Sequence, residues 1–133
     1  MRAIEFRGKS LQTGEWVYGG YYSQDDCRKG DRRHVIVWEN KGPGMGVIHE
    51  PVDHETVGQR TGLKDNNGTD IYEGDVVKAD IYGKEFAGLV QYSQGLGLYY
   101  LSDMARSDTE LWICEEKEVV GNIHDNPELL EVE

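Results

Sequence analysis

Histidines are the residues of this chain best suited to bind a metal ion, and they occur at positions 34, 49, 54 and 124. Two are followed by glutamate, as His49-Glu50 and His54-Glu55, and these pairs resemble part of the HExxH motif of zinc proteases. That motif needs two histidines four residues apart on one face of a helix. Here they are five apart, with Pro51 between them in a segment predicted to be extended. We therefore expect no metal site.

Other chemical motifs also fail at particular positions. Asp65, Asn67 and Thr69 alternate like the first ligands of a calcium loop, but an EF-hand needs Gly at the sixth position and Glu at the twelfth. Those positions hold Asp70 and Val76. The segment GPGMG at 42–46 precedes a predicted strand, and no Gly-Lys-Ser/Thr follows to bind phosphate. No serine has the sequence context of a nucleophile elbow. The sequence predicts a protein that is not an enzyme and needs no cofactor.

Cysteine usage and the N-terminus indicate the compartment. Cys27 and Cys114 lie 87 positions apart and form no CxxC pair, which favours free thiols in a reducing environment. The opening MRAIEFRGKS lacks the apolar core of a secretory signal. No apolar run approaches the roughly 20 residues of a membrane span. We expect a cytoplasmic protein with no membrane partner.

Charge is distributed unevenly along the 133 residues. Residues 1–60 contain 9 Lys and Arg against 9 Asp and Glu, whereas residues 61–133 contain 5 against 16 and carry the whole net charge of -11. An acidic surface repels phosphate backbones and argues against general nucleic-acid binding. Such a surface also keeps a small protein soluble without any further role.

The elements that would position these residues are organised around residues 57–79. An extended approach at Thr56-Val57 leads into a predicted polar loop that ends in an Asn67-Gly68 turn. A short strand at Ile71-Tyr72, a break at 73–75 and a second strand at Val76-Val77 follow. Further short strands separated by turn residues are predicted at 3–7, 15–22, 34–39, 47–53, 85–92, 96–101, 110–113 and 118–123. This spacing is typical of an antiparallel barrel or sandwich. The tail, with Pro127 at a suitable first position, predicts a short helix, and the polar segment 102–109 has room for one helical turn.

The predicted fold is mainly β, with an N-terminal β lobe at 1–57 and a small antiparallel barrel at 58–133 that includes a short C-terminal tail. We expect the core to contain the following residues: Phe6, Val17, Val35, Val37, Ile71, Val76, Val90, Leu98, Trp112, Val120 and Ile123.

Three long segments resemble the YopX-like family of phage and prophage proteins. They are RAIEFR at 2–7 with VYG at 17–19, ETVGQRTGLKD at 55–65 through Asn67-Gly68 to IYEGDVV at 71–77, and EVVGNIHDNPELL at 118–130. The resemblance implies a phage-derived protein with an SH3-like C-terminal barrel, and it supplies no catalytic residues. Glycines 62, 68 and 74 fit positions that need unusual φ or close backbone approach.

Three functions are compatible with these features. The leading hypothesis is a non-enzymatic phage accessory protein of the host cytoplasm that forms homo-oligomers and binds an unidentified phage or host protein. Exposed strand edges and the unlike charge of the two parts of the chain favour it.

The second is nucleic-acid binding through the strand that holds Trp16 and Tyr18 and a predicted polar loop at 23–33 that holds Arg28, Lys29, Arg32 and Arg33. The third is an acidic mimic of nucleic acid that occupies a host protein's basic groove. Its candidate carboxylates are Asp65, Asp70, Glu73, Asp75, Asp80, Glu115, Glu116 and Glu118.

Overall fold

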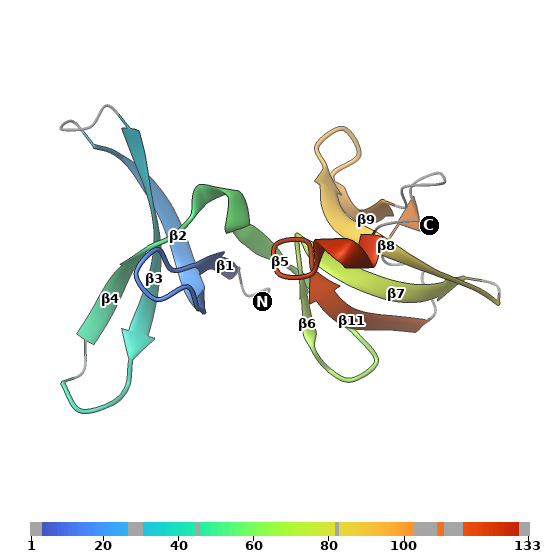
Figure 1. Ribbon diagram of the computed structural model, residues 1–133, viewed down its shortest axis with the longest axis horizontal. Helices are drawn as coiled ribbons and strands as arrows, with labels where there is room; N and C mark the ends of the chain where they lie inside the picture. The colour runs from blue at the N-terminus through green and yellow to red at the C-terminus, as the bar shows by residue number, and fades with distance from the viewer. Residues whose placement is uncertain are drawn as a thin grey trace. The chain divides into compact units, whose positions relative to one another are not determined.

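The computed structural model describes residues 4–26, 31–44, 46–81, 83–102, 109–110 and 116–130. The chain forms two compact units, Met1–Gln59 and Arg60–Glu133. Both are built from antiparallel strands, and the helical segments within the described ranges are two 3-10 turns, η1 and η3 (Figure 1). The predicted mainly β fold is therefore confirmed.

The N-terminal unit is a sheet in the order β4-β3-β2-β1, continued by the first residues of β5. Its elements are β1 (Phe6–Lys9), β2 (Trp16–Asp26), β3 (Asp31–Asn40), β4 (Gly46–Pro51), η1 (His54–Thr56) and the start of β5 (Gly58–Lys64). The predicted first hairpin is present, since β1 pairs with β2 from Phe6↔Gly19 to Lys9↔Trp16.

The second and third strands are longer than the sequence predicts. The polar segment 23–33 was expected to be a loop, but residues 23–26 belong to β2 and residues 31–33 to β3. Asp25 lies opposite Arg32 in the register, and their side chains form an ion pair of 2.7 Å. Opposite charges directly across an antiparallel pair support strand pairing even where both side chains are exposed. The prediction of a loop was therefore wrong at both of its ends.

The C-terminal unit contains a five-stranded sheet in the order β10-β9-β8-β7-β11, together with the pairing of β5 and β6. Its elements are β6 (Asp70–Tyr72), β7 (Asp75–Ile81), β8 (Lys84–Ser93), β9 (Leu98–Ser102), β10 (Thr109–Glu110), β11 (Glu116–Asn122) and η3 (Pro127–Leu130). Within the described ranges the sheet is open, because β10 and β11 are edge strands that do not pair with each other. The predicted antiparallel pairing is therefore present, and the described strands do not close into a barrel.

Glycines explain how the chain turns around β5 and β6. Gly62, Gly68 and Gly74 all have positive φ, at 88°, 82° and 91°, which agrees with the expectation that these positions need unusual φ. The segment 58–64 was expected to be a polar loop, but it forms β5 and pairs with β6 from Arg60↔Tyr72 to Lys64↔Asp70. The register shifts between those two pairs, where Gly62 takes a conformation that other residues rarely adopt.

The core of the C-terminal unit contains Ile71, Val77, Ala79, Val90 and Leu101, all almost fully buried. The prediction was right for Val35, Ile71, Val76 and Val90, which are at most 1% exposed. It was wrong for Val120, which is 41% exposed, whereas the neighbouring Val119 packs against the core. Exposure alternates along β11, so Val120 lies on the outward face with Glu118 while Val119 faces the core. Trp112 lies outside the described residues.

Candidate interaction edges

The edge of β11 that does not pair with β7 is covered by the turn at Asp65 and Asn66. The Val119 N–H donates to Asp65 Oδ2 at 2.9 Å, and the Lys117 N–H donates to Asn66 Oδ1 at 3.3 Å. The Asn66 N–H donates in return to the Lys117 carbonyl at 2.8 Å. With β7 paired on the opposite side, β11 has partners on both sides along this stretch. Covering an edge in this way removes a template for unwanted pairing.

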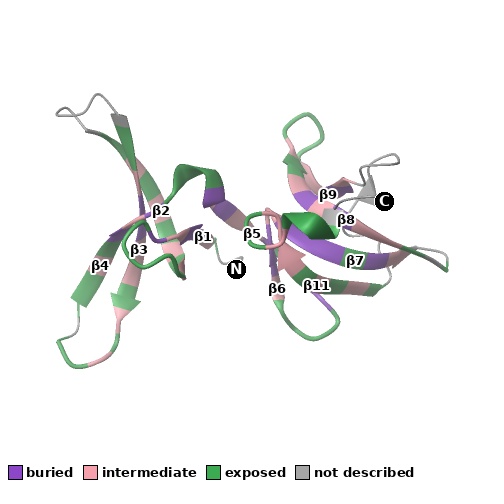
Figure 2. Cartoon of the chain, viewed as in Figure 1, coloured by how far each residue is buried: buried purple, intermediate pink, exposed green. Residues whose placement is uncertain are grey.

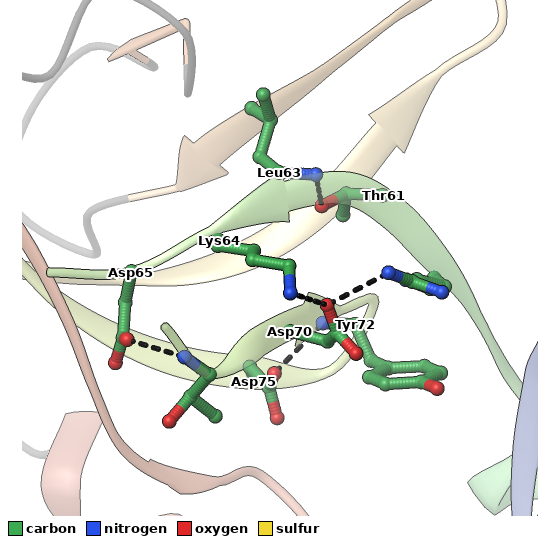
Figure 3. A network of polar contacts seen from close by, with 9 residues as sticks. Thr61, Leu63, Lys64, Asp65, Asp70, Tyr72 and Asp75 are labelled. Atoms are coloured by element: carbon green, nitrogen blue, oxygen red, sulfur yellow. Dashed lines mark hydrogen bonds and ion pairs between the residues drawn. The ribbon is translucent and has the colours of Figure 1, made fainter. Parts of the chain in front are cut away.

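Asp65 holds its own turn together as well. Its Oδ1 accepts hydrogen bonds of 2.9 Å from the N–H groups of Asn67 and Thr69 (Asp65 is labelled in Figure 3). Burial alone would raise the pKa of Asp65, but the N–H donors of Val119, Thr69 and Asn67 outweigh it and lower the pKa. The carboxylate therefore stays ionised and inward, and it is part of the fold rather than of the acidic surface.

Asp70 and Asp75, two other carboxylates proposed to mimic phosphates, also form polar contacts within the fold (Figure 3). Asp70 Oδ1 forms ion pairs with Arg60 at 2.9 Å and with Lys64 at 3.8 Å. Asp75 is 2% exposed, and its Oδ2 accepts a hydrogen bond of 2.8 Å from the Tyr72 N–H across the turn. Glu73, within that turn, is half-buried. This group is a mixed-charge structural network, which does not resemble a row of phosphates.

The remaining acidic candidates surround a small depression on the sheet. Its volume is about 80 Å³, and it is lined by Asn66, Lys78, Ala79, Asp80, Glu85, Glu116, Lys117 and Glu118. Small-molecule sites usually occupy roughly 300–1,000 Å³. Lys78 Nζ lies 3.8 Å from Glu85 Oε2, so positive and negative side chains are interspersed around the depression. The depression is too small and too polar to enclose a substrate. Glu115 lies outside the described residues.

The edge of β4 differs from that of β11. In the part of the chain that the structure describes, β4 pairs with β3 on one side and with no strand on the other (Figure 1). Its residues from Gly46 to His49 are exposed or half-buried, and Val47 is 61% exposed (Figure 2). The only acidic residue of β4, Glu50, is buried and accepts a hydrogen bond of 2.7 Å from the Ser10 hydroxyl. The exposed residues of β4 are Gly46, Val47 and His49, so the strand presents no exposed carboxylate.

Only some residues of the predicted nucleic-acid-binding surface lie in the described ranges. Arg28 and Lys29 lie outside the described residues, and Arg33 is exposed on β3. Arg32 is exposed but engaged with Asp25 and with the Ser23 hydroxyl at 2.9 Å. Trp16 is half-buried under the cations of Arg7 and Lys9, whose distances from its ring centre are 4.6 and 5.7 Å. Tyr18 is 45% exposed.

Histidines that are distant in sequence come together in the N-terminal unit. The rings of His34 and His54 have centres 4.3 Å apart, and His34 Nδ1 shares a hydrogen bond of 2.6 Å with the Tyr21 hydroxyl. Nothing in the sequence indicated this pair, because it depends on η1 folding back toward β3. Over the described ranges, no group of three or more potential metal ligands is found. No described helix is long and apolar enough to cross a membrane.

Comparisons with known proteins agree with this architecture. The family model described as YopX protein matches residues 5–131. A crystal structure of protein EF1440 from Enterococcus faecalis is similar over 98% of this chain and 100% of that chain, with a TM-score of 0.58 and 24% identity. At that identity the likeness concerns the fold alone. A comparison with curated proteins found no match.

Proposed function

The chain belongs to the YopX family, and from its strand edges we propose that it is a non-enzymatic phage accessory protein that self-associates and binds protein through β4. The observation that carries this proposal is the contrast between two edges. The β11 edge is covered by Asp65 and Asn66, whereas in the described chain the β4 edge pairs with no strand on its outer side and has no exposed carboxylate. An exposed edge strand offers backbone donors and acceptors to an incoming extended segment.

The direction of the backbone groups on β4 supports this role. The Pro51 carbonyl points away from β3, since it accepts a hydrogen bond of 2.9 Å from the Leu11 N–H. Backbone groups of an antiparallel strand alternate between its two sides. Residues two and four positions before Pro51, which are His49 and Val47, therefore direct their N–H and C=O groups to the open side. Val47 and His49 are the residues that would pair with a partner strand.

A second copy can occupy this edge because β4 adds no exposed negative charge to the contact. Two chains that each carry -11 repel one another over most of their surfaces. Two antiparallel β4 strands would bring together Val47, Ile48 and His49, and the buried Glu50 would add no exposed negative charge. An extended segment of a phage or host protein would use the same backbone groups and compete with the second copy.

Sedimentation velocity over a concentration series tests the proposal with a Val47→Pro variant. Proline removes the outward N–H of residue 47 while leaving the hydrogen bonds to β3 in place, and edge strands tolerate it. We expect wild type to dimerise reversibly and Val47→Pro to remain monomeric. Val47→Thr, which keeps the N–H and a β-branched side chain, is the matched control and should dimerise.

Salt separates strand pairing from contact between unlike charges. A β4–β4 dimer should persist between about 0.05 and 0.5 M salt, since raising the salt screens the repulsion between acidic copies. Dissociation over that range would replace the β4 proposal with a head-to-tail charge contact. A wild-type monomer at every concentration and salt would remove self-association altogether.

A further inference from the structure

The contact between His34 and His54 has a consequence that is independent of self-association. His34 lies on β3, and His54 is the first residue of η1, which joins β4 to β5. Their ring centres are only 4.3 Å apart, and the rings are tilted by 43°. Two neutral imidazoles pack well at that separation, whereas two imidazolium ions repel one another.

We propose that His34 and His54 form a proton-operated latch, which holds η1 against the sheet when the imidazoles are neutral and releases it when both are protonated. The device is regulatory and belongs to the N-terminal unit alone. It acts on the segment that connects the open strand β4 to β5.

The surrounding groups favour a neutral His34. Partial burial first, then the neighbouring His54 and Arg32, lower the pKa of His34 below its usual value. The Tyr21 hydroxyl, which reaches His34 from β2, can donate to neutral Nδ1 or accept from protonated Nδ1, so it permits both states. Among the described residues, the exposed Arg33 precedes His34 in the chain, Arg32 is paired with Asp25, and the exposed Asp53 and Glu55 lie on either side of His54 in sequence.

The backbone around η1 shows what the latch would release. The Lys9 N–H donates to Thr56 Oγ1 at 2.8 Å, and the Asp53 N–H donates to the Lys9 carbonyl at 2.9 Å. The Val57 N–H donates to the His54 carbonyl at 3.3 Å, which is a long hydrogen bond. Separation of the two rings would pull His54 away and weaken this last bond before the others.

Amide protection and histidine titration, both measured by NMR, test the latch. Between about pH 7.5 and 5.5, we expect the protection factors of Thr56 and Val57, corrected for intrinsic exchange, to fall at least about threefold relative to Val77 in the core. In His54→Asn this fall should disappear, and the titration midpoint of His34 should rise. His124→Asn removes an exposed histidine of the C-terminal unit, and it should leave both readouts as in wild type.

Either of two results would overturn the latch: an unchanged His34 midpoint in His54→Asn, or equal protection of Val57 at both pH values in wild type. His54 is exposed, so its replacement should not prevent folding. His54→Gln, with a longer amide side chain, provides a second neutral variant for the same two measurements. Neither readout depends on the oligomeric state, so failure of the β4 proposal would leave this test intact.

Discussion

Replacing Asp65 by Asn is the most direct test of how the C-terminal unit is held together. The substitution keeps the shape of the side chain, and its carbonyl oxygen can still accept from the N–H groups of Asn67 and Thr69. The new amide group would face the Val119 N–H, so donor would meet donor where a bond of 2.9 Å now exists. Asp65 is 7% exposed, so water cannot readily replace the missing acceptor.

The size of the effect follows from these contacts. Hydrogen bonds to a charged group contribute about 1.5–3 kcal/mol each, and an unsatisfied buried donor costs about as much. We therefore expect Asp65→Asn to lower the free energy of unfolding by about 2–3 kcal/mol in urea denaturation. Glu116→Gln, an exposed acid-to-amide change on the same edge strand, is the matched control and should change it by less than about 0.5 kcal/mol.

The pH dependence gives a second readout for the same variant. Because the folded pKa of Asp65 is lowered, its contribution is fully present above the ordinary value of about 3.9 and is lost as pH falls through the folded pKa. Wild type should therefore lose stability relative to Asp65→Asn as pH falls below about 4. A cost under about 1 kcal/mol at neutral pH, with an unchanged exchange rate at the Val119 amide, would refute the role assigned to this carboxylate.

Three further predictions concern other parts of the chain. A Cβ at Gly19 would lie 2.0 Å from the Val37 carbonyl oxygen. Gly19→Ala should therefore lower the free energy of unfolding by at least about 2–3 kcal/mol in thermal denaturation. Gly20→Ala is the control and should be well tolerated, because nothing lies within 4 Å of a Cβ at that position. Equal melting temperatures would contradict this packing. Asp70→Asn should lower the free energy of unfolding by about 1–2 kcal/mol because it leaves the largely buried Arg60 without its ion pair. A loss of stability no larger than that caused by Lys64→Met would show that the Arg60–Asp70 pair is unimportant. Single-stranded DNA should give no mobility shift at low salt, since Arg32 is engaged with Asp25; a shift that Arg32→Ala and Arg33→Ala abolish would favour the nucleic-acid hypothesis.

Local signals predicted much of this fold, and the misses have physical causes. Asn67-Gly68, the turn at Glu73-Gly74 and the β-branched strand around Val35 are decided by neighbours in sequence, and all were predicted. The strand β5 was missed because GQRTGLK has no alternation of apolar and polar residues, and its pairing with β1 and β6 is what makes it a strand. Val120 was placed in the core because Val119 and Val120 are both apolar, and the sequence does not show which of the two faces the core.

The candidate site was harder to predict than the fold. Acidic residues could be counted, but their inward or outward direction depends on tertiary hydrogen bonds such as that between Asp65 and Val119, which are 54 positions apart. Likewise, an edge strand is defined by the absence of a neighbour on one side, and the order of strands in the sheet decides this. His34 and His54 were treated as separate residues for the same reason.

The closure of β11 by Asp65 and Asn66 also affects the order in which the chain can fold during synthesis. Strand β11 pairs with β7, but about 40 residues separate the end of β7 from the end of β11. At about 5–20 residues per second, a ribosome needs several seconds to produce that stretch. During that interval β7 has no partner on the side that β11 later occupies, and the Asp65 turn has no strand to cover. Chains that stop short of residue 116 should therefore expose the β7 edge and associate with one another or with chaperones.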